Sequence, residues 1–154
     1  MAFNEDLRYG ETGEHIAWVQ LLESPKTRQV LDVRKDPYFQ EKDIDFLQLD
    51  VKNNVNKIEV KTDRQAHKTG NIAFETKSNS NEGCLARSEA DFIYYYIPEV
   101  REVIVIKLDM LKGFIIHTKP KEVNMGDNAK GYLLNINDLI AYQVAWRKEV
   151  QNGY

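Results

Sequence analysis

Residues 43–61 read DIDFLQLDVKNNVNKIEVK, and this stretch decides how the rest of the chain is interpreted. Apolar and polar residues alternate on both sides of a central Asn-Asn pair, a pattern typical of two strands joined by a turn. Residues two apart in a strand project to one face, so Glu59 and Lys61 lie together, about 6–7 Å apart, while Val60 points into the core. If the chain turns between the two strands, Asp45 reaches the same place.

Two carboxylates beside an ammonium group can hold a hard divalent cation and an activated water. Asp45, followed by the triplet Glu-Val-Lys at 59–61, resembles the motif of the PD-(D/E)xK nuclease superfamily. Ile44 stands where that motif has proline. The resemblance implies a single domain over residues 1–154, similar to Holliday junction resolvases and small restriction-type endonucleases. The implied fold is α/β, a mixed central sheet flanked by helices with an αβββαβ core.

The resemblance also implies the activity of a metal-dependent DNA endonuclease that hydrolyses phosphodiester bonds. The cation, Mg²⁺ or Mn²⁺, is expected on the carboxylates of Asp45 and Glu59 and on the backbone carbonyl of Val60. Lys61 would orient or deprotonate the attacking water, or neutralise charge on the phosphate, and the sequence leaves these roles open. Two alternatives also stay open: a nuclease subunit active only in a larger recombination or transposition complex, and a non-catalytic DNA-binding domain on the same fold.

Further acidic residues are candidates for the same site. Glu14 resembles the acidic residue on the first helix of the junction resolvases, and Glu11 is the competing choice. Glu75 is the last residue of a segment, residues 70–75, that begins with Gly-Asn and resembles one in phage and prokaryotic members. If the strands pair antiparallel, Glu75 can face the same side as Glu59. Gln40, just before the Asp45 segment, is a candidate for positioning phosphate or water.

Basic residues gather after the motif although the chain carries a formal net charge of −3. A local basic patch can contact phosphates even on an acidic protein, and the alternative is an ordinary charged loop surface. The candidates for DNA contact are Arg64, His67, Lys68, Lys77 and Arg87. The expected partners are DNA and further copies of the chain, as a homodimer or higher oligomer, because two strand cuts need two sites.

Composition limits the other classes of function. The chain has 154 residues, enough for one domain, and a single cysteine, which excludes an intramolecular disulfide. Neither a nucleotide-binding glycine motif nor a Cys/His zinc spacing occurs. No run of about 20 apolar residues and no signal-peptide pattern is present, so we expect no membrane association and an intracellular, cytoplasmic protein. So compact a nuclease suits a prokaryotic, phage or mobile-element origin.

Periodicity and turn residues predict the order of the remaining elements. Helices are expected over 12–23, 109–117 and 137–146, the last capped by Asn137, and a short helix is expected to start at Ser88 as its cap. Strands are expected over 29–33, 42–50, 57–63, 71–77, 92–97, 102–107 and 131–135, with loops at 64–70 and 78–83. The sequence leaves open whether the strand near Phe92 or the strand near Val103 completes the core.

Overall fold

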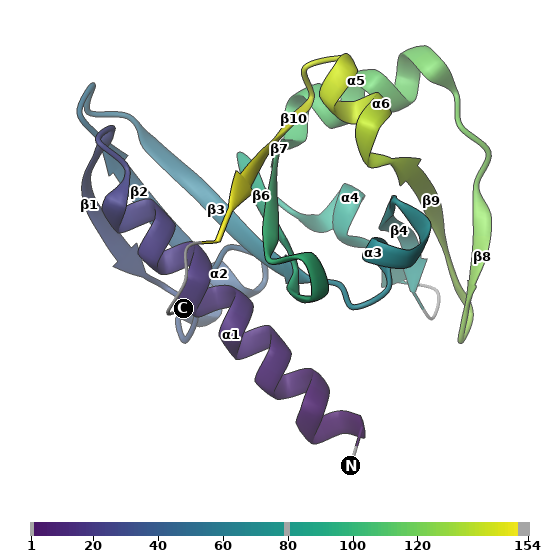
Figure 1. Ribbon diagram of the computed structural model, residues 1–154, viewed down its shortest axis with the longest axis horizontal. Coiled ribbons are helices and arrows are strands. Elements are labelled where there is room, and N and C mark those ends of the chain that lie inside the picture. Colours follow the sequence, from purple (N-terminus) through teal and green to yellow (C-terminus); the bar gives the residue numbers. More distant parts are fainter. Residues whose placement is uncertain (1, 79–80, 151–154) are drawn as a thin grey trace.

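The computed structural model describes residues 2–78 and 81–150 and contains two β-sheets flanked by helices (Figure 1). The central sheet has six strands in the order β1-β2-β3-β6-β7-β10. Only β3 and β6 pair in parallel among these neighbours, so the sheet is mixed, as predicted. Its strands are β1 (Thr27–Asp32), β2 (Phe46–Asp50), β3 (Val55–Thr62), β6 (Phe92–Ile97), β7 (Glu102–Lys107) and β10 (Ala145–Glu149).

The second sheet has four strands in the order β5-β4-β9-β8 and lies to the right of the central sheet in Figure 1. Its strands are β4 (Asn71–Ser78), β5 (Asn81–Glu82), β8 (Val123–Gly126) and β9 (Ala129–Asn135). The remaining elements are α2 (Pro37–Gln40), α3 (Ala66–Thr69), α4 (Cys84–Arg87), the 3₁₀ turn Pro98–Val100, α5 (Leu108–Thr118) and α6 (Ile136–Ala141).

The long helix α1 (Ala2–Glu23) covers one face of the central sheet. Ile16, Ala17 and Leu21 are fully or almost fully buried, and their spacings of one, four and five residues place them on one side of the helix, as in an amphipathic helix that packs on a core. The helix approaches β3 closely at Gly13, where a Cβ atom would collide with the Thr62 hydroxyl oxygen. The helix begins at Ala2, well before the predicted start at residue 12, and it ends at Glu23, as predicted.

Strands β6 and β7 are buried on both faces, and this explains their unbroken apolar sequences. One face of each strand packs with α1, and the opposite face packs with the second sheet and its helices. Tyr94 and Val105 belong to the first of these two cores, and Tyr95 and Ile104 belong to the second. Of the two strands that could complete the core, the one near Phe92 (β6) pairs directly with β3, whereas the one near Val103 (β7) lies beyond it.

Two predicted helices are wrong. The C-terminal helix ends at Ala141, it is capped by Asn135 rather than Asn137, and residues 145–149 form strand β10. The left-handed φ of Gln143, +60°, turns the chain out of the helix, and pairing with β7 then satisfies the backbone hydrogen bonds. Ser88 caps no helix, because α4 lies before it and ends at Arg87.

Two smaller differences concern the loops and the second sheet. Strand β8 was not predicted, and the polar loop 64–70 contains α3, which ends at a left-handed Gly70. In the predicted loop 78–83, residues 79 and 80 lie outside the described part of the chain. Across residues 2–78 and 81–150, no helix has the length and apolar character needed to cross a membrane.

Candidate active site

The β2–β3 hairpin brings Asp45 to the middle of β3. Asp45 lies one residue before β2, and its backbone N–H donates to the carbonyl of Ile58 at 2.8 Å. Its carboxylate Oδ2 accepts a hydrogen bond from the backbone N–H of Val60 at 2.7 Å. The turn that leads into β2 requires a left-handed residue at Asp43, with φ +55°. The Asp45 side chain is thus held by the backbone of the triplet that the sequence singled out.

Glu59 and Lys61 project from β3 to the face away from α1. Val60 packs against the core under α1, and its neighbours in the strand point the opposite way. Lys61 Nζ lies 3.2 Å from Glu59 Oε1, so the two side chains form an ion pair. Asp45, Glu59 and Lys61 are therefore brought together as the strand spacing predicts.

Glu59 is a buried carboxylate with two polar partners. Glu59 is only 5% exposed, and the hydroxyl of Ser88 donates a hydrogen bond to its Oε2 at 2.8 Å. Burial raises the pKa of Glu59, and the nearby Lys61 ammonium and the Ser88 hydrogen bond act in the opposite direction. The sequence predicts Ser88 as a helix cap, whereas in the structure its hydroxyl binds Glu59. Its contact with Glu59 had no local signal, because 29 residues separate the two.

Asp45 is also perturbed by its surroundings. Burial raises its pKa to about 6, and the negative charges of Glu14 and Glu59 add to this effect. The hydrogen bond from Val60 and the Lys61 ammonium lower it in part. Two carboxyl groups with raised pKa values thus lie within the influence of one ammonium group, that of Lys61.

This donor set fits a small divalent cation. Within the described part of the chain, no cluster of three or more His, Cys, Asp or Glu side chains is placed to hold a metal ion, so the side-chain ligands would be Asp45 and Glu59 alone. The N–H and C=O groups of a strand residue point to the same side, and the Val60 N–H points at Asp45, so its carbonyl faces that side too. Mg²⁺ commonly uses one or two carboxylates and keeps several waters.

Glu14 approaches the site from α1 and is already paired. Its Oε2 lies 2.8 Å from Arg34 Nη1, and Arg34 also binds Asp32 at 2.7 Å. Glu14 is close enough to Asp45 to raise the pKa of that carboxyl. Glu11, the competing candidate, is exposed. Arg34 was not among the predicted site residues, since an Arg near a turn has no distinctive sequence signal.

The structure places Gln40 at the end of α2 and Glu75 on β4 of the second sheet. The Gln40 amide donates to the backbone carbonyl of Arg34 at 2.7 Å, which fixes the loop before β2. Glu75 is exposed on β4, opposite Gly131 of β9. The antiparallel pairing that would place Glu75 on the side of Glu59 does not occur, because the neighbours of β3 are β2 and β6, and β4 belongs to the second sheet.

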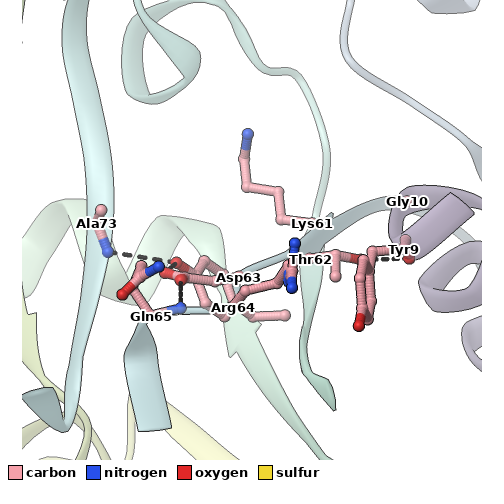
Figure 2. A pocket seen from close by; sticks show the side chains of 9 residues that line it. Tyr9, Gly10, Lys61, Thr62, Asp63, Arg64, Gln65 and Ala73 are labelled. Atoms are coloured by element: carbon pink, nitrogen blue, oxygen red, sulfur yellow. Dashed lines mark hydrogen bonds between the residues drawn. The ribbon is translucent and has the colours of Figure 1, made fainter. Parts of the chain in front are cut away.

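A pocket of about 480 Å³ adjoins Lys61, between α1 and β4. Figure 2 shows Tyr9 and Gly10 on one side, Ala73 on the other, and the Lys61 side chain extending between them. The pocket wall is fixed by Tyr95, whose hydroxyl donates to Asp63 and accepts from the backbone N–H of Ala73.

The five predicted DNA-contacting residues are spread over several elements. Arg64 lines the Lys61 pocket, where its guanidinium stacks 4.1 Å from the ring centre of Tyr9. His67 Nδ1 lies 3.6 Å from a Glu99 oxygen, and Arg87 Nε lies 2.9 Å from Asp43 Oδ2. Lys68 and Lys77 are exposed, on α3 and β4 respectively.

Comparisons with known proteins show a similarity to a solved structure but no match in sequence families. No protein-family model matches the chain, and no curated protein matches it. Among solved structures, the chain is similar to the bacterial homing endonuclease I-Ssp6803I, with a TM-score of 0.48 and 22% sequence identity. The similarity covers 66% of this chain and 64% of that one, so it spans less than two thirds of either protein.

Proposed function

We propose that this chain is a metal-dependent DNA endonuclease that hydrolyses phosphodiester bonds at Asp45, Glu59 and Lys61. The observation that carries the proposal is the pair of carboxylates with raised pKa values, held side by side with a single ammonium group. Such a pair is costly to the folded protein, and carboxyl groups with perturbed pKa values are concentrated at functional sites. The position of Asp45 just before β2 and of Glu59 on the next strand, β3, also supports the resemblance to the PD-(D/E)xK nucleases.

Each residue has a definite task in this proposal. Asp45, oriented by the Val60 N–H, and Glu59, oriented by the Ser88 hydroxyl, would hold Mg²⁺ or Mn²⁺ together with the Val60 carbonyl. When bound, the cation lowers the pKa of water and stabilises negative charge on the phosphate. Lys61 is about one-third exposed, so its ammonium can reach a phosphate oxygen or the attacking water while it stays paired with Glu59.

DNA is the proposed partner, and a homodimer or higher oligomer is the proposed active form, since one such site cuts one strand. Arg64 and Lys68 follow Lys61 along the chain, and Arg64 lines the pocket beside it, so this segment is the proposed path of the DNA backbone. Glu14 is proposed as an accessory acid whose charge is moderated by Arg34.

The test is cleavage of supercoiled plasmid, linear duplex, single-stranded DNA and a four-way junction with Mg²⁺, Mn²⁺ or EDTA. Wild type, Lys61→Ala, Glu59→Gln and the matched control Lys112→Ala, an exposed lysine on α5, are compared. Metal-dependent cutting by wild type and the control, and its loss in the two site variants, is the expected result. Sedimentation of the wild type with and without DNA measures the oligomeric state.

Two other outcomes discriminate the alternatives. Calorimetric Mg²⁺ or Mn²⁺ binding that requires Glu59, without any cutting, favours a subunit that needs a larger complex. DNA binding with no metal binding favours a non-catalytic domain and refutes the proposed chemistry.

A further inference from the structure

A second hollow lies on the opposite face of the central sheet and is separate from the catalytic cluster. It has a volume of about 530 Å³, within the range of small-molecule sites. Ile58, Tyr94 and Val105 line it, and all three belong to the core under α1, whereas Glu59 and Lys61 project to the other face. The hollow opens beyond the C-terminal end of α1, where Ser24 and Lys26 line it.

The floor and one wall of this hollow are aromatic. Phe92 and Trp146 meet edge to face, with ring centres 6.1 Å apart and planes at 76°. Trp146 lies on β10, at the edge of the central sheet (Figure 1), and is 41% exposed. A partly exposed indole beside a second ring provides a surface on which a planar ring can stack.

The rim of the hollow is cationic. Lys26, Lys52 and Lys148 line it, and the described residues offer none of the three a carboxylate within ion-pair distance. Asp50 is the one acidic residue in the lining, and its oxygens accept hydrogen bonds from the backbone N–H groups of its own turn, at Lys52 and Asn54, and from the Asn56 side chain. The hollow therefore has an excess of positive charge.

Lys148 carries the strongest sign that an anion belongs here. Its side chain is half-buried, and its ammonium lies 5.6 Å from the ring centre of Tyr94. Burial lowers the pKa of Lys148, and the positive charge of Lys26 lowers it further. A bound anion between the two lysines would remove both penalties.

Amide groups line the part of the hollow beside β2 and β3. Gln48 is buried, donates to the Thr27 hydroxyl at 2.6 Å and accepts from the Asn56 amide at 3.2 Å. These fixed amides add hydrogen-bonding groups next to an aromatic wall, and a nucleobase has edges and faces that match both.

We propose that this hollow binds a phosphorylated nucleoside, with the phosphate between Lys26 and Lys148 and the base against Trp146. The ligand is either a free nucleotide or the 5′-phosphorylated end of a DNA strand, because both present the same phosphate and base. The proposal goes beyond the endonuclease activity and does not depend on it, since no group of the catalytic cluster lines the hollow.

The experiment titrates the full chain in EDTA, so that no cleavage interferes, and follows tryptophan fluorescence and calorimetric heat. The probes are adenosine 5′-monophosphate, adenosine, inorganic phosphate, and a thymidine hexanucleotide with a 5′-phosphate or a 5′-hydroxyl. The variants are Lys148→Met and Trp146→Phe, and the control is Lys112→Met, which changes charge equally on a remote helix. Circular dichroism and thermal melting check that each variant is folded.

The expected result is that a 5′-phosphorylated probe binds at least tenfold more tightly than its unphosphorylated counterpart. Lys148→Met should weaken this binding at least tenfold, Trp146→Phe should abolish the fluorescence change, and Lys112→Met should behave as wild type. Binding of the mononucleotide identifies a free-nucleotide site, and binding of the hexanucleotide alone identifies a strand-end site. The proposal is overturned if neither binds, or if folded Lys148→Met binds as tightly as wild type.

Discussion

Replacement of Asp45 by asparagine tests whether the site is built for a cation at the expense of stability. Burial raises the pKa of Asp45 from 3.8 to about 6, so the folded protein disfavours the charged form. At roughly 1.36 kcal/mol per pH unit, this interval corresponds to about 3 kcal/mol of destabilisation at neutral pH. Asparagine keeps an oxygen that can accept the Val60 hydrogen bond, and it carries no charge. Asp45→Asn should therefore be the more stable protein and the inactive one.

The difference in unfolding free energy between Asp45→Asn and wild type should depend on pH, and the raised pKa of Asp45 sets the direction. A carboxyl with a raised folded pKa costs stability above that pKa and costs nothing below its unfolded value of 3.8. In EDTA, the advantage of Asp45→Asn should therefore be about 3 kcal/mol at pH 7.5 and fall to about 1 kcal/mol at pH 4.5. Urea unfolding at both pH values measures it. The control Asp127→Asn, in the exposed β8–β9 turn, makes the same charge change and should show no such gain.

Addition of Mg²⁺ should make wild type the more stable of the two proteins. A cation that binds only the folded wild type stabilises it by mass action, and the variant lacks one of the two carboxylates. The reasoning is refuted if Asp45→Asn is no more stable than wild type at pH 7.5 in EDTA, or if its advantage is the same at pH 4.5.

Three further predictions concern single side chains. Lys61→Met should reduce plasmid cleavage at least 100-fold, the size expected for a proton-transfer or charge-stabilising group, and unchanged cutting rates would remove Lys61 from the mechanism. Ser88→Ala should lower the free energy of unfolding by about 1.5–3 kcal/mol at pH 7, because a buried carboxylate loses a hydrogen bond; a neutral result in urea unfolding would contradict the described contact. Gly13→Ala should lower the melting temperature, because its Cβ meets Thr62, whereas Gly10→Ala, with open space around it, should be neutral or stabilising by about 0.5–1 kcal/mol. Equal melting temperatures for the two glycine variants would argue against the close approach of α1 to β3.

The sequence predicted the parts of the fold that depend on local periodicity. The alternation around the Asn-Asn turn predicts the hairpin, and the aromatic and branched residues of 92–97 and 102–107 predict two buried strands. Local periodicity failed at the C-terminus, where residues 145–149 pair with β7 as an edge strand. There the backbone hydrogen bonds of a distant neighbour outweigh the helix-like spacing of the apolar residues.

For the candidate site too, the sequence predicts one part, the positions of the residues, and does not predict another, their chemistry. The spacing of Glu59 and Lys61 places both on one face of a strand, and the turn brings Asp45 beside them, so these three positions follow from the chain's own geometry. Their chemistry does not follow from it. The raised pKa values require burial in the folded protein, and Ser88, the hydrogen-bond partner of Glu59, is 29 residues away in the sequence.

By itself, then, the sequence determined the hairpin, the shared face of the catalytic candidates and the two buried strands, because each depends on residues a few positions apart. Only the tertiary structure decided that β6 pairs with β3, that Glu75 lies in another sheet, and that Ser88 holds Glu59. It also decided that a cationic, aromatic hollow forms behind the catalytic face. These features depend on which segments exclude water from one another, and that is a property of packing between distant parts of the chain rather than of any local pattern.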